Sequence, residues 1–373
     1  PRTKHALVFA TQSPHKVLAA LSQASIILAK NSAEQQLDHE RFNEAYMMHT
    51  STSPHYGMIA SIDVATGMMA GPAGRSLVQE TLDEALSFRR AMQQTAEQMA
   101  EEEWWFDVWE PEASLAQAEL QATDWTLDDQ AEWHGFGKMS SDFAMLDPIK
   151  VSLLTPGVEE KGRLAKSGIP AALVTRFLAE RGLVVEKTGL YSFLILFSLG
   201  ITKGKWSTLL SELREFKRLY DQDSPLEVTL PSLARHPSYQ SLGLRALGER
   251  LHQCYKKHSL IKLMRQMYTT LPQISLRPAD AYQQMVRGEV ESVPVSALAG
   301  RLSAVMLVPY PPGIPVIMPG ERFPLDNSYI ADYLAAAIEL EEQFPGFAND
   351  IHGLRMEQFD GQVNWRVDCL IEG

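Results

Sequence analysis

The chain has 373 residues, of which 45% are hydrophobic and 21% charged, a balance typical of globular proteins. Its net charge of −12 argues against a nucleic-acid partner, because neutralising phosphates requires a basic surface. The longest apolar stretch, residues 190–201, is shorter than the roughly 20 residues of a membrane-spanning helix, so no membrane segment is predicted. Two cysteines, Cys254 and Cys369, cannot build a disulfide framework or a zinc site, and no secretion signal is recognisable. We therefore expect a cytoplasmic protein without a metal.

The first predicted elements are a strand, a polar loop and a helix. The apolar run at residues 5–10 predicts a buried strand, and residues 17–29 predict a helix after the polar turn. Further helices are predicted at residues 37–48 and 56–69, before a Gly-Pro breaker at residues 71–74. This order is typical of α/β folds, in which loops at strand ends carry the chemistry.

The rest of the chain divides into two predicted regions. The first begins with a long amphipathic helix at residues 75–103 and a tryptophan-rich irregular stretch at residues 104–135. A β-α-β-β-α run follows at residues 149–154, 169–181, 183–186, 192–198 and 206–220. This run predicts an open sheet with helices on one side. From about residue 224 the pattern is mostly helical, with helices near residues 243–257, 260–270, 278–287 and 329–344. A proline-rich segment at residues 308–319 and a final strand at residues 363–370 complete the chain.

The strongest candidate for chemistry is the segment Ser13-Pro14-His15-Lys16, at the predicted strand-to-helix turn. A lysine amine in a dry pocket has a lowered pKa and attacks carbonyl groups. A hydroxyl and an imidazole beside it suit an anion such as a phosphate near a helix N-terminus. As a pattern, however, four residues are more often explained by a solvated lysine in the first turn of a helix.

This segment resembles the Schiff-base lysine motif of the bacterial, pyridoxal-phosphate-dependent lysine, arginine and ornithine decarboxylases of fold type I. The family has Ser-Thr-His-Lys, then Leu-Leu-Ala and Ser-Gln-Ala-Ser, where this chain has residues 13–25, SPHKVLAALSQAS. The resemblance continues through FNEAYMMH at residues 42–49, WHGF at 133–136, LDPIKV at 146–151, PYPPG at 309–313 and PGF at 345–347. It therefore spans nearly the whole chain.

The resemblance implies an α/β fold in three parts. Residues 1–70 would be the C-terminal part of an aspartate aminotransferase-like cofactor domain, residues 71–223 a small α+β domain, and residues 224–373 an α+β C-terminal decarboxylase domain. In the family, the acid that pairs with the pyridine nitrogen, the ring that stacks on the cofactor and the main phosphate loop all precede the lysine. Since the match begins almost at Lys16, we expect the chain to be the later half of a larger enzyme.

The resemblance also implies roles for four residues at the cofactor. Lys16 would hold pyridoxal 5'-phosphate as an internal aldimine. Ser13 and His15 would lie near the phosphate, with His15 also suited to proton transfer. The hydroxyl of Ser51 would reach the phosphate of the neighbouring subunit, which implies a homodimer or larger homo-oligomer. Pro14 replaces the family's usual threonine and removes a backbone donor, which predicts weaker cofactor binding.

Glu186, at a predicted strand end, is the candidate residue for substrate preference. Its carboxylate could pair with the distal ammonium of lysine. The sequence at residues 184–189 resembles that of lysine-type members. A solvated glutamate is the alternative. Residues 197–206 instead look like arginine-type members. The function that the resemblance implies is decarboxylation of L-lysine to cadaverine and CO2. The alternatives are an arginine decarboxylase that forms agmatine, or a catalytically incomplete fragment that acts only in subunit association.

Overall fold

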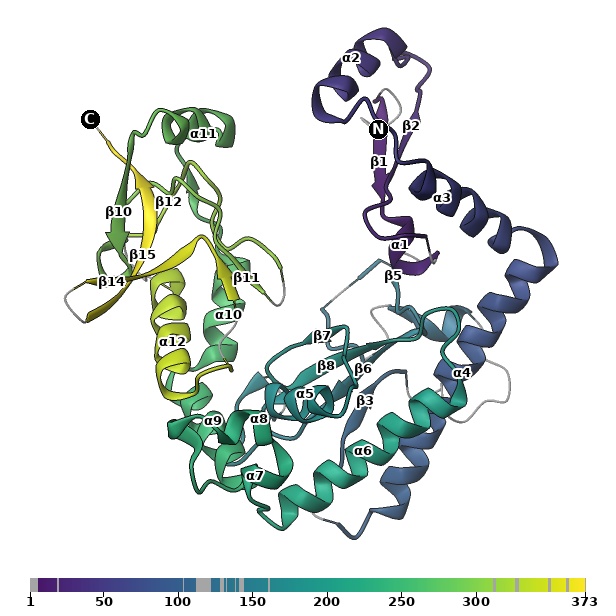
Figure 1. Cartoon of the computed structure of the whole chain (residues 1–373), viewed down its shortest axis with the longest axis vertical. Coiled ribbons are helices and arrows are strands. Elements are labelled where there is room, and N and C mark those ends of the chain that lie inside the picture. Colours follow the sequence, from purple (N-terminus) through teal and green to yellow (C-terminus); the bar gives the residue numbers. More distant parts are fainter. Residues whose placement is uncertain are drawn as a thin grey trace. The chain divides into compact units, whose positions relative to one another are not determined.

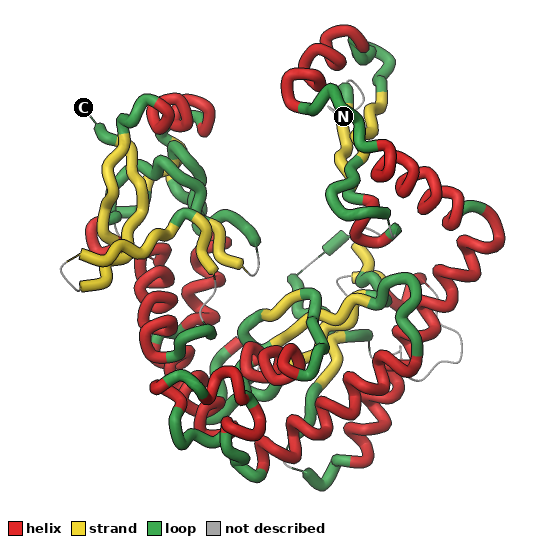
Figure 2. The backbone as a smooth tube through the Cα atoms, in the orientation of Figure 1, coloured by secondary structure: helices red, strands yellow, loops and turns green. Residues whose placement is uncertain are grey.

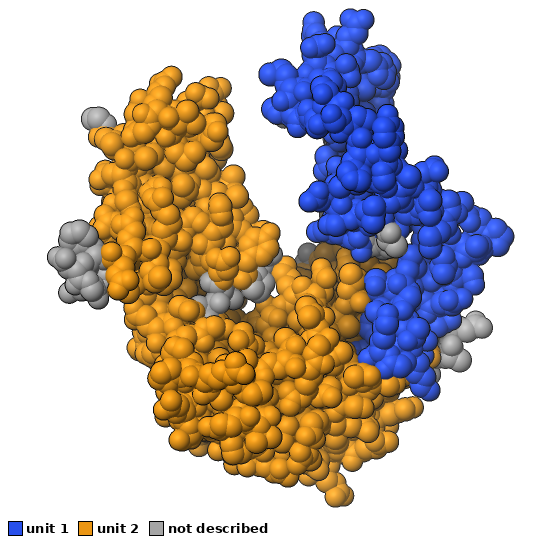
Figure 3. Space-filling view, in the orientation of Figure 1, with its two compact units in different colours: residues 1–88, 197–205 blue, residues 89–196, 206–373 orange. Residues whose placement is uncertain are grey.

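The computed structural model describes residues 6–18, 20–102, 104–111, 122–127, 131, 133–137, 139–140, 144–159, 162–310, 313–325, 329–347, 350–359 and 362–372. The chain forms two compact units (Figure 3). Unit 1 comprises Pro1–Phe88 and Phe197–Lys205, and unit 2 comprises Arg89–Leu196 and Trp206–Gly373. Helices and strands occur in both units, so the architecture is mixed α/β as predicted (Figure 2).

Unit 1 begins with an antiparallel hairpin, whose strands are β1 (Val8–Gln12) and β2 (Ile26–Lys30) (Figure 1). A single helical turn, α1 (Pro14–Val17), lies between them. The predicted helix at residues 17–29 is therefore wrong. Gln23 adopts a left-handed φ of 74°, which interrupts a helix, and the β-branched pair at the start of β2 favours an extended strand.

The next helices of unit 1 agree with the predicted ones. Helix α2 (His39–His49) is capped by Asp38, which accepts hydrogen bonds from the backbone N–H groups of Glu40 and Arg41. Helices α3 (Tyr56–Met69) and α4 (Gly71–Gln98) follow. The predicted break lies between them, where Gly71 has a φ of +66° and a Cβ on Gly74 would meet the Met69 carbonyl oxygen at 2.0 Å.

Unit 1 buries few of its large apolar side chains. All five residues of β1 are exposed, so the prediction of a buried first strand is wrong. Its small buried cluster consists of Ala20, Ala24 and Ala65. Large exposed side chains lie on the hairpin and on α2 and α3: Val8, Phe9, Ile27, Leu28, Met48, Tyr56, Ile59 and Val64. Near the hairpin, these alanines and the partly buried Leu18 and Ile62 enclose little apolar area, so packing stabilises this part of unit 1 only weakly.

Unit 2 contains a four-stranded antiparallel sheet in the order β3-β6-β8-β7. The strands are β3 (Asp107–Trp109), β6 (Lys150–Leu154), β7 (Lys187–Thr188) and β8 (Ser192–Leu196). One face is fully buried through Val151, Leu153 and Phe193. Helices α5 (Ala171–Glu180) and α6 (Lys203–Asp221) supply aromatic rings to this core, where the Phe177 and Phe216 rings lie 5.2 Å apart.

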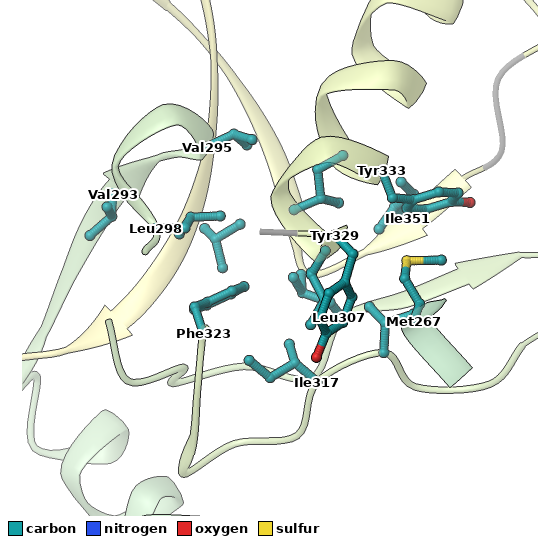
Figure 4. Close-up of a cluster of buried hydrophobic side chains, with 14 of the residues drawn as sticks. Met267, Val293, Val295, Leu298, Leu307, Ile317, Phe323, Tyr329, Tyr333 and Ile351 are labelled. Atoms are coloured by element: carbon teal, nitrogen blue, oxygen red, sulfur yellow. The ribbon is translucent and has the colours of Figure 1, made fainter. Parts of the chain in front are cut away.

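The remainder of unit 2 combines helices with a second sheet. Its main helices are α9 (Leu244–Lys257), α10 (Leu260–Thr269), α11 (Pro278–Val286) and α12 (Tyr329–Gln343). Strands β10 (Val290–Pro294), β15 (Gln362–Leu370) and β14 (Leu354–Phe359) form an antiparallel sheet in that order. Their shared core contains Val293, Leu298, Phe323, Tyr329 and Tyr333 (Figure 4).

Shorter elements connect these parts. They are η3 (Ala122–Trp125), β4 (Thr126–Leu127), β5 (Ala144–Met145), α7 (Leu226–Thr229), α8 (Pro231–Ala234), η5 (Pro237–Tyr239), β9 (Gln273–Ile274), η6 (Val295–Ala297), β11 (Val308–Tyr310), β12 (Glu321–Arg322) and β13 (Asp350–His352). The proline-rich segment supplies β11, which pairs with β13 in a two-stranded sheet of the described residues, so it forms no central strand, as predicted.

A buried hydrogen-bonded pair joins the sheet to α9. The Nε2 atom of His252 lies 3.1 Å from the carbonyl oxygen of Ala165, which can only accept, so Nε2 carries the proton. In the neutral ring, Nδ1 then accepts from the Tyr191 hydroxyl at 2.7 Å. His252 is fully buried, and this desolvation lowers its pKa below the ordinary 6.5.

Acid should destabilise unit 2 through His252. Because the pKa is lowered in the folded state, the stabilising effect is complete above about pH 6.5 and is lost as pH falls from there toward the folded pKa. Urea unfolding at a series of pH values should show this loss in the wild type and a weaker one in His252→Gln. The control is His352→Ala, which removes an exposed histidine from β13. Identical pH dependence in wild type and His252→Gln would contradict this assignment.

Candidate active site

The predicted catalytic lysine lies in α1, the single helical turn of the hairpin. Its side chain is exposed and forms no hydrogen bond or ion pair with another described residue, so Lys16 is not in the dry pocket that its chemistry requires. The Lys16 backbone N–H donates to the Ser13 carbonyl oxygen at 3.1 Å, which closes the turn. The amine is therefore free to meet an incoming carbonyl group.

Ser13 and Pro14 form the start of this turn. The Ser13 hydroxyl makes no capping hydrogen bond and is exposed, so it is available to a ligand. Pro14 is buried at the first helical position, where its fixed φ suits the helix and its missing N–H is not needed for the helix. Since α1 is only four residues long, its N-terminus is a poor anion site, and side chains must supply the contacts instead.

The ring of His15 is oriented by a backbone contact that sequence reasoning missed. Its Nδ1 atom lies 2.9 Å from the carbonyl oxygen of Ala24. A carbonyl oxygen only accepts, so Nδ1 carries a proton and the neutral ring presents a basic Nε2. Ala24 is itself buried against Ala20 and Ala65, which fixes the acceptor. No sequence signal indicates this contact, because it depends on how the loop after α1 closes.

Ser51 lies in the loop between α2 and α3 of unit 1. Its hydroxyl is exposed and accepts a hydrogen bond from the Ser53 backbone N–H at 3.1 Å. No contact between Ser51 and the α1 turn is recorded among the described residues. The structure therefore brings Ser13, His15 and Lys16 together, and Ser51 belongs to the same unit without joining them.

Glu186 belongs to unit 2 and immediately precedes β7. Its backbone N–H donates to the Leu194 carbonyl oxygen at 2.9 Å, which extends the pairing with β8 by one residue. The carboxylate is exposed and forms no ion pair with another described residue. It is thus free to bind a cation.

The side chains around Lys16 fit an aldehyde that carries a phosphate. The free amine of Lys16 suits the aldehyde carbon, and the uncapped hydroxyl of Ser13 and the imidazole of His15 are hydrogen-bonding partners for a phosphate. Among the described residues, no group of three or more His, Cys, Asp or Glu side chains could hold a metal ion. No helix in the described part of the chain is long and apolar enough to cross a membrane.

Comparison with known families identifies the class of protein. The model of the Orn/Lys/Arg decarboxylase major domain matches residues 2–205, and the model of the Orn/Lys/Arg decarboxylase C-terminal domain matches residues 261–371. The chain belongs to the Orn/Lys/Arg decarboxylase family, which confirms the resemblance around Lys16.

Several relatives of the chain are lysine decarboxylases. The chain is 55% identical to lysine decarboxylase LdcA of Pseudomonas aeruginosa, over 98% of this chain and 49% of that protein. It is 43% identical to the constitutive lysine decarboxylase of Escherichia coli, over 97% of this chain and 49% of that protein. The solved structure of lysine decarboxylase A from Pseudomonas aeruginosa matches with a TM-score of 0.92 at 55% identity, covering 98% of this chain and 49% of that one. The chain spans about half the length of the curated relatives it matches.

Proposed function

We propose that this chain carries the cofactor lysine and the later domains of a pyridoxal-phosphate-dependent decarboxylase that converts L-lysine to cadaverine and CO2. The observation that carries the proposal is 55% identity to a lysine decarboxylase along 98% of the chain. Identity to the biodegradative arginine decarboxylase of Escherichia coli is lower, at 40%, so an arginine substrate is the less supported alternative. The proposed domains are residues 1–70, 71–223 and 224–373, assigned as the resemblance implies.

Each proposed site residue has a distinct task. Pyridoxal phosphate, when bound, supplies a ring that accepts the electron pair left behind by departing CO2. The Lys16 amine holds the aldehyde carbon, and the Ser13 hydroxyl donates to the phosphate. Because His15 Nδ1 is already committed to Ala24, Nε2 is the atom that accepts or delivers a proton. Glu186 pairs with the distal ammonium of the substrate.

The proposed enzyme is a cytoplasmic homodimer or larger homo-oligomer. In this assembly, the hydroxyl of Ser51 reaches the phosphate in the site of the neighbouring subunit. Its exposure and its purely local hydrogen bond in unit 1 support that task, because neither would need to change greatly for the hydroxyl to meet a second subunit.

Cofactor trapping and product analysis test the proposal together. The purified chain is mixed with pyridoxal phosphate, reduced with borohydride and digested, and we expect the label on the Lys16 peptide. Release of CO2 from lysine, arginine and ornithine is measured in parallel. Both assays are repeated after co-expression with the half of the Pseudomonas aeruginosa enzyme that lies outside the match. Labelling without lysine decarboxylation in either preparation would favour a non-catalytic association role, and no labelling in either would contradict the proposal.

Replacing Glu186 with glutamine should weaken lysine binding. Removing a charged hydrogen-bond partner is expected to raise KM for lysine by about tenfold with a smaller change in kcat. Norleucine, which lacks the distal ammonium, should show no such rise. Glu227→Gln, at another exposed glutamate of unit 2, is the matched control. Equal effects on lysine and norleucine would argue against the contact.

Restoring the family's threonine at position 14 should strengthen cofactor binding. Threonine returns a backbone N–H and a hydroxyl beside the phosphate contacts, and either can donate a hydrogen bond. An absorbance titration should give a Kd for pyridoxal phosphate several-fold lower in Pro14→Thr than in the wild type. An unchanged Kd would mean that neither donor reaches the phosphate.

A further inference from the structure

Unit 2 contains a cavity that the proposed reaction does not use. Its volume is about 310 Å³, at the lower end of the range of small-molecule pockets. It lies where β7, β8 and the start of α5 meet α9, α10 and α12, elements that are labelled in Figure 1. Most of the lining is apolar and comes from Ala172, Leu190, Phe193, Leu194, Leu260, Met264, Tyr333, Ala336, Ala337, Leu340 and Phe347. Such a lining favours an apolar ligand body.

The charge at this cavity is positive. Lys187 is the charged side chain among the described lining residues, which include no aspartate or glutamate. In the sheet, Lys187 is the partner of Leu194, and Leu194 is the partner of Ser152, so the three side chains lie in one row on one face. All three line the cavity. The Lys187 ammonium forms no ion pair or hydrogen bond with another described residue, so it is available to an anion.

A second donor of the cavity lacks an acceptor. Tyr255 is 3% exposed and lines the cavity, and its hydroxyl forms no hydrogen bond with another described residue. Its ring packs edge-on against Tyr191, with centroids 6.1 Å apart, but the Tyr191 hydroxyl is already bonded to His252. Burial raises the pKa of Tyr255 above its ordinary value, so the hydroxyl stays neutral and able to donate. The hydroxyl is accessible within the cavity rather than fully enclosed, so a ligand oxygen can replace water as its acceptor.

We propose that this cavity binds a small carboxylate with an apolar body, whose carboxylate is held by Lys187. A carboxylate offers acceptors only, and the unengaged donors of the lining, Lys187 and Tyr255, require acceptors. The apolar body replaces water against the leucine, phenylalanine and alanine side chains. Cadaverine does not meet these requirements, because it carries two ammonium groups and no carboxylate. Lysine meets them poorly, because its two ammonium groups find no aspartate or glutamate among the described lining residues. The described lining includes none of the residues proposed for the cofactor or substrate, although Glu186 directly precedes Lys187 in the chain.

Calorimetric titration of the full chain with octanoate tests the proposal, with octylamine as the probe of opposite charge and equal chain length. We expect octanoate to bind with a submillimolar Kd and octylamine at least about tenfold more weakly. Lys187→Met, which keeps the apolar stem, should weaken octanoate binding about tenfold and leave octylamine unaffected. Lys262→Met, at an exposed lysine of α10 outside the cavity, should change neither. Tyr255→Phe should weaken octanoate binding several-fold.

A second, cavity-filling variant keeps the proposal testable if Lys187→Met does not fold. Ala337 is partly exposed, so Ala337→Leu should be tolerated while it takes up cavity space and abolishes octanoate binding. A thermal melt of each variant confirms that it is folded. The proposal is overturned if octanoate does not bind at millimolar concentration. It is also overturned if octylamine binds equally well, or if Lys187→Met and Lys262→Met bind octanoate with the same Kd.

Discussion

Lys16→Ala should lower kcat for lysine decarboxylation by at least about 1000-fold. The substitution removes the amine that holds the cofactor aldehyde, and no other described lysine lies in the α1 turn. The visible absorption of the bound cofactor and the borohydride-stable label should disappear together. The matched control is Lys30→Ala, an exposed lysine at the end of β2 in the same unit, which should retain wild-type kcat and labelling.

Lys16→Ala and Lys30→Ala are compared in the preparation, the chain alone or the co-expressed complex, in which the wild-type chain decarboxylates lysine. Because the Lys16 side chain is exposed and forms no hydrogen bond or ion pair with another described residue, its replacement should leave the unfolding transition unchanged. A large loss of activity with unchanged stability therefore identifies a chemical role. If Lys16→Ala kept a tenth or more of the wild-type kcat, or if the label moved to another peptide without loss of rate, the assignment of the cofactor lysine would be wrong.

Arg89→Ala should lower the free energy of unfolding of unit 2 by about 3–5 kcal/mol. Arg89 is 1% exposed, and its guanidinium bonds to the Glu110 carboxylate at 3.0 Å and to the carbonyl oxygens of Pro148 and Lys150 at 3.2 Å each. Its charge also lies 5.0 Å from the ring centroid of Trp125. Burial lowers the pKa of Arg89, and the attraction of Glu110 opposes that shift. Removal of the arginine leaves a buried carboxylate and two carbonyl groups without this donor.

Urea unfolding of the adjacent variant Arg90→Ala provides the control. Arg90 lies one position further along the same helix, is only partly buried and forms no side-chain hydrogen bond or ion pair with another described residue, so its loss should change stability by less than about 0.5 kcal/mol. The double variant Arg89→Met with Glu110→Leu should be more stable than Arg89→Ala, because no charge is then left buried. A loss below about 1 kcal/mol in Arg89→Ala would show that water replaces the guanidinium contacts.

The sequence predicted most helices of the structure but misplaced elements near the candidate site. The apolar spacing of α5, α6 and α9 is strong, and their limits agree within a few residues with those predicted. Residues 17–29 have a comparable density of apolar residues, yet the described residues 20–25 form a loop and Ile26–Lys30 form β2, because pairing with β1 decides their conformation. The short strand expected at residues 183–186 lies instead at Lys187–Thr188, where the register with β8 fixes it. The residues of one segment alone do not indicate which distant segment it pairs with.

Only part of the candidate site could likewise be predicted from the sequence. Ser13, His15 and Lys16 are neighbours in the chain, so a local motif was enough to group them. The orientation of His15 depends on the Ala24 carbonyl group, which has no side-chain identity to recognise. The limit between the two units falls at Phe88, within α4, where no glycine or proline interrupts the helical pattern. Compactness is a property of long-range packing, and composition does not reveal it.

Helix α4 has 28 residues and belongs to both units. The stability of its backbone hydrogen bonds therefore differs between its two ends. Its buried side chains begin only at Thr81 and continue through Ala85, Phe88, Arg89, Met92 and Thr95, whereas nearly all of the first ten residues are solvated. Backbone amides near the start of the helix can therefore exchange their hydrogens through local fraying, and those near Met92 exchange only when the core of unit 2 opens. A steep change in amide protection is thus expected inside a regular helix rather than at a loop.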